Sequence, residues 1–555
     1  MFARCSIAVA SHCANFPCLG KKLLTILLAL LVNSQQMLTT QIPHGNTAQH
    51  FDGDALSARQ IAVRTLAVGV TGWLLLSQVL LLAFLGQPPL VIVGGAIVSV
   101  LLCAALARFG DWGAVGAVSR ETFAGLLAFA FAVFLLGGEG GLFYANTDWQ
   151  VRYAVLNDLT THPWPWAYDT GYGLTVLRCP VGIYLLPALV GKLGGQAAAE
   201  FAMLAQNAAL LAAILALAAP LFQPGRRRLI TLLLVTGFSG MDILGAILIR
   251  GNLQAHLESW SGFQYTANLT LAFWVPQHAL AGWLGAVFFL LWRKGMLPLH
   301  ALLLVVPALP LLSPLAVFGV VPFVAYAGFE SLLRRRISVA DIALPAVASM
   351  LAVPSLLYLS AGFVEVPTGT AHFPLLNYLA FYSFEILPFL AVLWLAYGHW
   401  SVDRVTVLIA GALMLILPLA RVGESIDFMM RAGIAPITII AITIAAILQD
   451  RPSDDMPNFQ AARRIALFVY IVGLAVPLGE TARAVFLPAS PQVQCGYYGV
   501  VPNGYVTYIS AFDRLPALIR PAHTVITQVR EPAQCWKGPW PVAMSRDFSF
   551  FTQYK

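Results

Sequence analysis

The polar stretch at residues 146–159 reads Asn146-Thr147-Asp148-Trp149-Gln150-Val151-Arg152-Tyr153-Ala154-Val155-Leu156-Asn157-Asp158-Leu159, and it interrupts a chain that otherwise consists of long apolar runs. It places an acid, a tryptophan and an arginine directly beyond the third of these runs. Ionisable side chains at a membrane boundary cost free energy to insert, so their presence there indicates a function. The stretch therefore predicts a functional site around Asp148.

Composition assigns the chain to the polytopic membrane proteins. The sequence of 555 residues is 59% hydrophobic and only 10% charged, and its mean hydropathy is +0.78. That leaves too little polar surface for a water-soluble protein of this length. A helix of about 20 apolar residues crosses roughly 30 Å of hydrocarbon and satisfies its own backbone polar groups. The predicted fold class is therefore an all-α polytopic membrane protein with about 13 transmembrane helices.

One apolar segment, 180–195, is short, contains Pro187 and carries Lys192 near its end. We predict that it lies at the membrane interface and does not cross the bilayer. The predicted spans are at residues 65–86, 89–107, 121–138, 197–220, 229–249, 273–292, 297–312, 313–332, 339–361, 377–397, 404–421, 431–449 and 464–485.

The distribution of Lys and Arg supports this interpretation, because cytoplasmic loops carry an excess of both residues. If 180–195 does not cross, the strong basic clusters all fall on one side. The net charge of +7 is then spread over short orientation signals and does not indicate nucleic-acid binding. The clusters assigned to the cytoplasm are Arg59 and Arg64, Arg108 and Arg120, Arg226 to Arg228, Arg293 and Lys294, Arg334 to Arg336, Arg404, and Arg451 with Arg463 and Arg464.

This topology divides the chain into three parts and places it in the inner membrane of a bacterium. Cys495 and Cys535 lie on the oxidising side, where they either form a disulfide or remain two unrelated thiols. The parts are a cytoplasmic extension at 1–60 that we expect to be disordered, a transmembrane domain at 61–485 with a large periplasmic loop at 139–196, and a small periplasmic region at 486–555.

Two pieces of the periplasmic loop have the pattern of helices that lie on a membrane surface. In 148–159, apolar residues recur at helical spacing, and the aromatic Trp164-Pro165-Trp166 that follows suits the headgroup zone. The second piece is 180–195. We expect both helices to be interfacial, and the side chains of Asp158 and Asp169 to be solvated.

Other polar residues fall on the same predicted side of the membrane. Asp242 lies in the periplasmic half of the fifth span, where a lone carboxylate costs about 2.5 to 3.5 kcal/mol. Gln277 and His278 begin the sixth span, and Arg421 and Arg431 flank the turn between the eleventh and twelfth. Each has a structural alternative. Asp242 would be a satisfied carboxylate in a helix bundle, His278 a hydrogen-bonding residue, and the arginines side chains that reach lipid headgroups.

Acids and arginines at one membrane face suit a reaction on a lipid-linked sugar phosphate. Arginine offers planar, permanently charged donors to phosphate oxygens. A carboxylate can take the proton of an acceptor hydroxyl as that oxygen attacks the anomeric carbon and the lipid phosphate leaves. Asp148 is the first candidate for this base and Asp242 the second. The candidates for binding the donor phosphate are Arg431, Arg421 and Arg152, and those for binding substrate are Trp149, Gln277 and His278.

Two further segments carry a family resemblance. The second loop helix reads Gly182-Ile183-Tyr184-Leu185-Leu186-Pro187-Ala188-Leu189-Val190-Gly191-Lys192-Leu193-Gly194, and a later segment reads Met429-Met430-Arg431-Ala432-Gly433-Ile434-Ala435-Pro436. Together with an acidic residue that opens a long loop after an early span, this layout resembles the GT-C glycosyltransferase superfamily, which includes protein O-mannosyltransferases and the lipid A aminoarabinose transferase. The resemblance implies inverting transfer from a polyprenyl-phosphate sugar outside the cytoplasmic membrane, with Asp148 as the base.

The sequence departs from the superfamily pattern in two respects. The acidic loop follows the third span, where the best-known members have it after the first, so two additional N-terminal helices are required. Asp148 and Asp158 stand ten residues apart, so the loop holds no close pair of aspartates. Dependence on a divalent metal stays open, and the sequence implies no other cofactor.

Other functions remain compatible with the sequence, namely a transporter or lipid flippase, an O-antigen ligase or polymerase, and a non-catalytic assembly protein. Transporters usually have related halves with broken helices near the membrane midplane. No repeat is visible in this chain, and its polar residues favour one face. The leading expectation is therefore a glycosyltransferase whose partners are a polyprenyl-phosphate sugar donor, membrane lipid, and a glycan, lipid or protein acceptor of the cell envelope.

Overall fold

The computed structural model is mostly helical, as predicted. The predicted extension at 1–60 lies outside the described residues except for Gln60, which begins β1 (Gln60–Ala62) and pairs with β2 (Ala117–Ser119). The structure describes residues 60–541, apart from 111, 113–115, 252–255, 371–373, 400, 424, 451–455, 530–533 and 539.

Among the described residues, seven helical segments are long and apolar enough to cross a membrane, and four further apolar helices are shorter. The chain thus has the helical character of a membrane protein. The long segments are α2 (Val63–Phe84), α3 (Pro89–Arg108), Gln196–Leu221 with α7 (Gln196–Ala218), α13 (Pro314–Leu333), α14 (Val339–Ser360), Leu375–Leu395 and Pro457–Phe486. The shorter ones are α6 (Leu185–Gly194), Leu299–Leu311 with α12 (Leu299–Val305), Arg404–Leu419 with α17 (Arg404–Ile416), and α19 (Ile434–Gln449).

The predicted span at 229–249 is broken, which corrects the expectation of one continuous helix. Helix α8 (Arg226–Thr236) ends before a non-helical turn, and a short α9 (Asp242–Gly245) runs into the π-helical η3 (Ala246–Arg250). Gly237 and Gly240 favour a break because glycine loses the most conformational freedom in a helix. Asn268 stabilises it, because its backbone N–H donates to the carbonyl of Phe238 and its side chain donates to that of Val235.

The predicted span at 377–397 also contains an irregular turn. It consists of α15 (Leu375–Phe381), the π-helical η6 (Tyr382–Ile386) and α16 (Leu387–Leu395). A π-turn inserts an extra residue into the helix and often marks a functional position. Glu385 lies within this turn and is buried.

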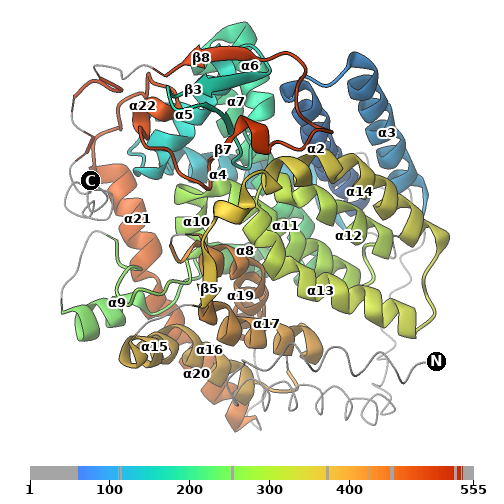
Figure 1. The fold of residues 1–555 in the computed structure, drawn as a ribbon. Helices are drawn as coiled ribbons and strands as arrows, with labels where there is room; N and C mark the ends of the chain where they lie inside the picture. The colour runs from blue at the N-terminus through green and yellow to red at the C-terminus, as the bar shows by residue number, and fades with distance from the viewer. Residues whose placement is uncertain are drawn as a thin grey trace, which may run out of the picture. The chain divides into compact units, whose positions relative to one another are not determined.

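The loop at 139–196 and the C-terminal region after 486 contribute strands to one sheet. Strands β3 (Trp166–Asp169) and β4 (Leu174–Leu177) come from the loop, and β7 (Ile509–Ala511) and β8 (Val525–Gln528) from the region after 486. They make one four-stranded sheet in the order β7-β4-β3-β8, and Figure 1 shows the C-terminal strands beside the loop. Cys495 and Cys535 are joined in a disulfide in the same region.

Helix α5 (Asp148–Thr161) is buried by protein, where the sequence predicted a surface on the membrane. It contacts α6, α7 and the C-terminal α22 (Tyr497–Val500), and its buried residues occupy most of its faces. Asp158, expected to be solvated, is 3% exposed. Its Oδ2 accepts hydrogen bonds from the Tyr168 hydroxyl at 2.6 Å and the Tyr497 backbone N–H at 2.7 Å. The amphipathic spacing of α5 thus reflects packing inside the protein.

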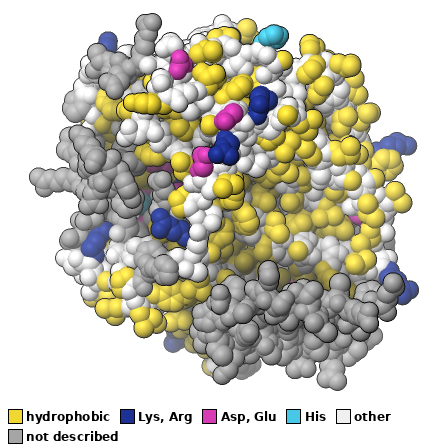
Figure 2. Space-filling view, viewed as in Figure 1, with side chains coloured by type: hydrophobic (Ala, Val, Ile, Leu, Met, Phe, Trp, Pro, Cys, Tyr) yellow, Lys and Arg dark blue, Asp and Glu magenta, His cyan; other side chains and the backbone are white. Residues whose placement is uncertain are grey.

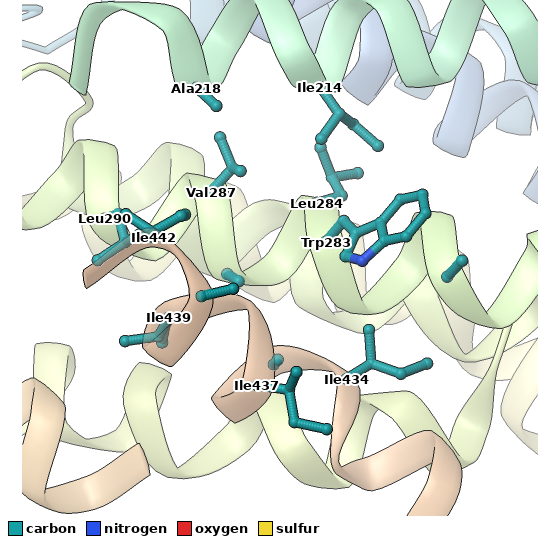
Figure 3. Close-up of a cluster of buried hydrophobic side chains, with 14 of the residues drawn as sticks. Ile214, Ala218, Trp283, Leu284, Val287, Leu290, Ile434, Ile437, Ile439 and Ile442 are labelled. Carbon is teal, nitrogen blue, oxygen red and sulfur yellow. The ribbon is translucent and has the colours of Figure 1, made fainter. Parts of the chain in front are cut away.

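The core surrounds helix α11 (Pro276–Arg293), which is buried along nearly its whole length. Figure 3 shows Trp283, Leu284 and Val287 of α11 between apolar side chains of α7 and α19. Gly282 permits the close approach of Ile434, since a Cβ there would collide with it. Close packing of this kind fixes the start of α11, which carries Gln277 and His278.

Large apolar side chains cover the outer faces of α3 and α14. Leu90, Val100 and Val339 are 83%, 67% and 83% exposed, and Figure 2 shows a broad apolar area on the side of the molecule where these helices lie. Exposed apolar surface of this extent marks contact with an apolar partner. Lipid is the partner that long apolar helices predict.

The sheet makes the predicted topology testable, since it joins residues 166–169 to 525–528 and so places both on one side of any membrane. In a background without free cysteines, we expect an impermeant thiol reagent to label Tyr172→Cys and Leu518→Cys from outside the cell. Arg227→Cys and Arg336→Cys should react only after the membrane is permeabilised. If position 172 is labelled from the cytoplasm, the predicted orientation in the membrane is wrong.

Candidate functional site

The site begins with Asp148, the first residue of α5. Its backbone N–H donates to Oδ1 of Asn146 at 3.0 Å, which fixes the start of the helix. Its side chain is 40% exposed, in contrast to the 3% exposure of Arg152 one turn later. The Arg152 guanidinium donates to Asp148 Oδ2 at 3.3 Å. The carboxylate is therefore held from one side and open on the other.

Arg152 connects the loop helix to the start of the core helix. Its Nε donates to the Trp274 carbonyl at 3.0 Å and its Nη1 to Gln277 Oε1 at 2.8 Å. A buried guanidinium needs such partners, because an unpaired buried charge is strongly unfavourable. The contacts with Asp148, Trp274 and Gln277 give Arg152 the geometry of a positioning residue.

Gln277 and His278 occupy the first turn of α11. The preceding α10 (Asn268–Trp274) stops at Val275, and Pro276 starts the new helix, a position that suits proline because its missing N–H has no intrahelical partner. His278 Nδ1 lies 2.7 Å from the Ser313 hydroxyl, which also caps α13 by accepting from the Ala316 N–H. The imidazole is thereby fixed between two helix starts.

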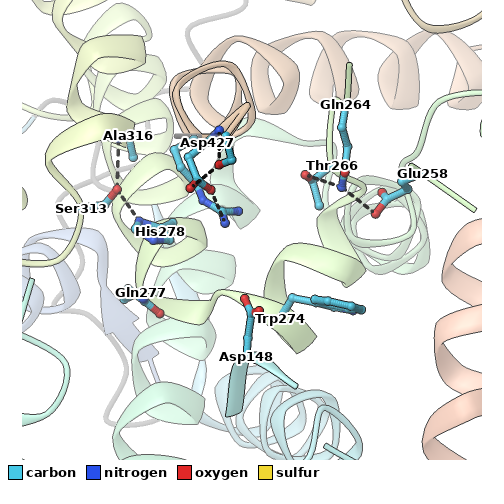
Figure 4. A network of polar contacts seen from close by, with 12 residues as sticks. Asp148, Glu258, Gln264, Thr266, Trp274, Gln277, His278, Ser313, Ala316 and Asp427 are labelled. Carbon is cyan, nitrogen blue, oxygen red and sulfur yellow. Dashed lines mark hydrogen bonds and ion pairs between the residues drawn. The ribbon is translucent and has the colours of Figure 1, made fainter. Parts of the chain in front are cut away.

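Arg431 approaches the same place from α18 (Asp427–Ala432). Its Nη2 donates to Asp427 Oδ1 at 3.1 Å, and Asp427 itself is 45% exposed. Arg431 is 9% exposed, and in the described part of the chain its Nε has no hydrogen-bond partner. Figure 4 shows His278 beside Asp427, the carboxylate that pairs with Arg431, and Gln277, the neighbour of His278 in α11, accepts a hydrogen bond from Arg152.

Five of the predicted site residues therefore converge, namely Asp148, Arg152, Gln277, His278 and Arg431. Figure 4 shows Asp148, the consecutive Gln277 and His278, and Asp427 around one region, carried by three separate helices. We refer to these five residues as the Asp148 group. It combines a half-exposed carboxylate, two guanidinium groups and the N-terminus of a long helix, an arrangement suited to binding an anion next to a base.

Two other predicted residues have different surroundings. Trp149 is fully buried, donates from its indole to the Phe273 carbonyl at 2.8 Å and packs against Tyr153, so its ring is part of the core under α5. Arg421 lies on β6 (Ala420–Val422), which pairs with β5 (Thr368–Thr370), and its Nε donates to the Gly423 carbonyl.

Asp242 belongs to a second, acidic group. It is 1% exposed, and its Oδ1 accepts from the Trp260 indole at 3.3 Å. Burial raises the pKa of Glu258 well above its ordinary value, and the charge of Asp242 raises it further. The other members were not predicted, although acids inside the apolar runs at 375–395 and 457–486 are a recognisable signal. These members are Glu258, Glu385, Glu480 and His256.

Trp274 connects the two groups. Its carbonyl accepts from Arg152 of the first, and its indole donates to Glu480 Oε2 of the second at 3.1 Å. The ring of His256 stacks against it at 4.8 Å, and the Arg483 guanidinium lies over it at 5.7 Å. Across the described residues, no set of three or more His, Cys, Asp or Glu side chains is arranged to hold a metal ion.

Comparison with known proteins gives no match for this chain to a protein-family model, a curated protein or a solved structure.

Proposed function

We propose that the protein transfers a sugar from a polyprenyl-phosphate carrier to an acceptor of the cell envelope, at the Asp148 group. The observation that carries this proposal is the convergence of a half-exposed carboxylate with a buried guanidinium that retains an unpartnered Nε. The carboxylate suits proton removal, and the guanidinium suits a phosphate oxygen. The inner membrane, with the site on the periplasmic side, is part of the same proposal.

Arg431 is the residue we assign to the donor phosphate. An orphaned guanidinium nitrogen in a buried side chain gains a charge-assisted hydrogen bond when an anionic oxygen arrives. The start of α11 adds positive potential beside it, because the first N–H groups of a helix lack intrahelical partners. Arg152 adds its charge but keeps its three protein partners.

Asp148 is the proposed general base. The acceptor hydroxyl attacks the anomeric carbon, its proton passes to a carboxylate oxygen of Asp148, and the bond between that carbon and the lipid phosphate oxygen breaks. The phosphate leaves with the electron pair and is held by Arg431. The exposed side of Asp148 admits the acceptor, while Arg152 keeps the carboxylate in place.

A cavity beside the site supports a lipid-linked donor. Its volume is about 240 Å³, and Phe273 forms part of its wall while the Phe273 carbonyl accepts from Trp149 and Asn146 next to Asp148. An apolar cavity that adjoins a phosphate site suits a hydrocarbon chain. The other lining residues are Phe129, Val133, Leu136, Leu233, Thr236, Gly237, Leu269 and Thr481.

Arg431→Ala tests this proposal. We expect it to weaken binding of a short-chain polyprenyl phosphate to the purified protein by roughly 10- to 100-fold, the value of a lost charge-assisted hydrogen bond. Arg431→Lys should restore affinity only in part, since Lys lacks the planar fork. Calorimetric titration measures both variants, with the exposed Arg336→Ala as the matched control. If Arg431→Ala binds the polyprenyl phosphate with unchanged affinity, Arg431 does not hold the donor phosphate and contacts only lipid headgroups.

One observation favours the alternative of a transporter or lipid flippase. The break between α8 and α9 places buried acids at a discontinuous helix, as in many transporters. Purified protein in vesicles distinguishes the two functions. A transferase forms a product with a new glycosidic bond on one side of the membrane, whereas a flippase moves the lipid-linked sugar across it unchanged.

A further inference from the structure

Two buried carboxyl groups meet where two helices are irregular. Asp242 starts α9 directly after the break that follows α8, and Glu385 lies in the π-turn η6. Each is 1% exposed. Gly240 makes the approach possible, because a Cβ at this position would collide with the Glu385 carboxyl. Both acids therefore lie at helix irregularities, Asp242 at the break before α9 and Glu385 in the π-turn η6.

The hydrogen bonds of this pair are incomplete without a proton. Asp242 Oδ1 accepts from the Trp260 indole, but no donor among the described residues reaches Asp242 Oδ2 or either oxygen of Glu385. The Glu385 carboxyl lies directly against Gly240, which precedes Asp242 by two residues in the chain. Ionised carboxylates only accept hydrogen bonds, and two adjacent ones repel. A single proton between them supplies the missing donor and removes the repulsion.

A small cavity adjoins Glu385, and its walls contain both polar and apolar residues. Its volume is about 10 Å³, close to the space that one water occupies. Ser239 and Gly240 from the helix break line it together with Glu385 and Thr266. The Ser239 hydroxyl is buried and has no partner within the described structure, so it is a second polar group that requires a ligand.

We propose that Asp242, Glu385 and Ser239 form a proton-binding site in which Glu385 carries the proton, donates it to Asp242 Oδ2, and contacts a single water held by Ser239. The bound proton joins the broken segment at 237–245 to η6. This site is separate from the Asp148 group and does not depend on the proposed transfer reaction.

Several charged and titratable groups face this pair and contribute to its electrostatic environment. Glu258 is a further buried acid near the pair, His256 lies between Glu258 and Glu480 at 3.8 and 3.7 Å, and Arg483 is paired with Glu480. The tyrosines nearby are Tyr265 on the cavity wall, Tyr382 in η6, and Tyr470 on α20 (Pro457–Gly473), which approaches Gly237. A test must therefore compare variants that differ in the pair alone.

Glu385→Gln provides that comparison, because its amide donates to Asp242 without a titrating proton. The folded wild type retains a proton that an unfolded Glu releases, so its stability falls as rising pH removes that proton. Between about pH 6 and about pH 9, we expect the melting temperature of the wild type to fall relative to Glu385→Gln by about 2 °C or more. The full-length protein in detergent is measured by differential scanning fluorimetry.

Glu330→Gln is the matched control, since Glu330 is ion-paired to Arg293 and Arg334 away from the pair. It should keep the pH dependence of the wild type. If Glu385→Gln does not fold, Asp242→Asn is the second variant, with the same expected loss of pH dependence.

Two outcomes overturn the proposal. One is an identical pH dependence in the wild type and both pair variants. The other is a rise in wild-type melting temperature at about pH 9 in sodium chloride over choline chloride at equal ionic strength, which would indicate a metal cation in place of the proton. Both outcomes are read from melting temperatures, which do not depend on activity at the Asp148 group.

Discussion

Asp148→Asn is expected to lower the rate of sugar transfer by about 10²-fold or more while leaving the fold and donor affinity nearly intact. General-base catalysis typically contributes 10² to 10⁴. Asn is isosteric with Asp, and its Oδ1 still accepts from Arg152, so the side chain stays in place. The measurement is single-turnover transfer by purified, folded protein, with a polyprenyl-phosphate sugar as donor.

Asp169→Asn is the matched control for this experiment. Asp169 belongs to the same loop, lies on β3 and accepts from Gln528 Nε2 at 2.8 Å, apart from the Asp148 group. It should keep the wild-type rate. A wild-type rate in folded Asp148→Asn would end the assignment of Asp148 as base. Loss of expression and activity together, with normal turnover per folded molecule, would show a structural role.

Arg152→Ala should have the largest effect on stability. It leaves Gln277 Oε1 and the Trp274 carbonyl without their donor and separates α5 from the start of α11. Each buried acceptor left without its donor costs about 1 to 3 kcal/mol. We therefore expect a lower melting temperature, and in the folded fraction a loss of transfer comparable to that of Asp148→Asn, because the base loses its support.

Arg152→Lys and Arg334→Ala complete this comparison. Lys keeps the charge at position 152 but cannot reach three partners in one plane, so stability should be intermediate. Arg334 is 49% exposed in its pair with Glu330, and surface pairs contribute only about 0 to 1 kcal/mol. A melting temperature in Arg152→Ala equal to that in Arg334→Ala would contradict the positioning role.

The membrane character of the fold follows from the sequence because it depends on the length and composition of apolar runs. The break at 237–241 does not, since it depends on Asn268 accommodating free carbonyls and on Glu385 approaching Gly240. The sheet that joins the loop at 139–196 to the C-terminal region also could not be predicted from the sequence. Its strands have three or four residues, and β3 pairs with β8 from the other end of the chain.

The charged residues of the candidate site could be predicted from the sequence because they lie beside predicted spans. Asp148, His278 and Arg431 lie in the first or last turn of their helices, and Arg152 joins Asp148 to α11 from the second turn of α5. The role of Trp149 differs because the sequence does not show which face of α5 is covered, and protein covers most of them. Burial of Asp158 depends on Tyr497, which no local pattern relates to it.

The joining of α5 to the C-terminal region has a consequence for biosynthesis. The Tyr497 N–H that binds Asp158 is made 339 residues after it, and β8 is later still. The loop therefore leaves the ribosome long before the C-terminal region that packs on α5 has been synthesised. The helix that carries Asp148 reaches its final packing only after nearly the entire chain has been made. Incomplete chains thus lack the finished surroundings of Asp148.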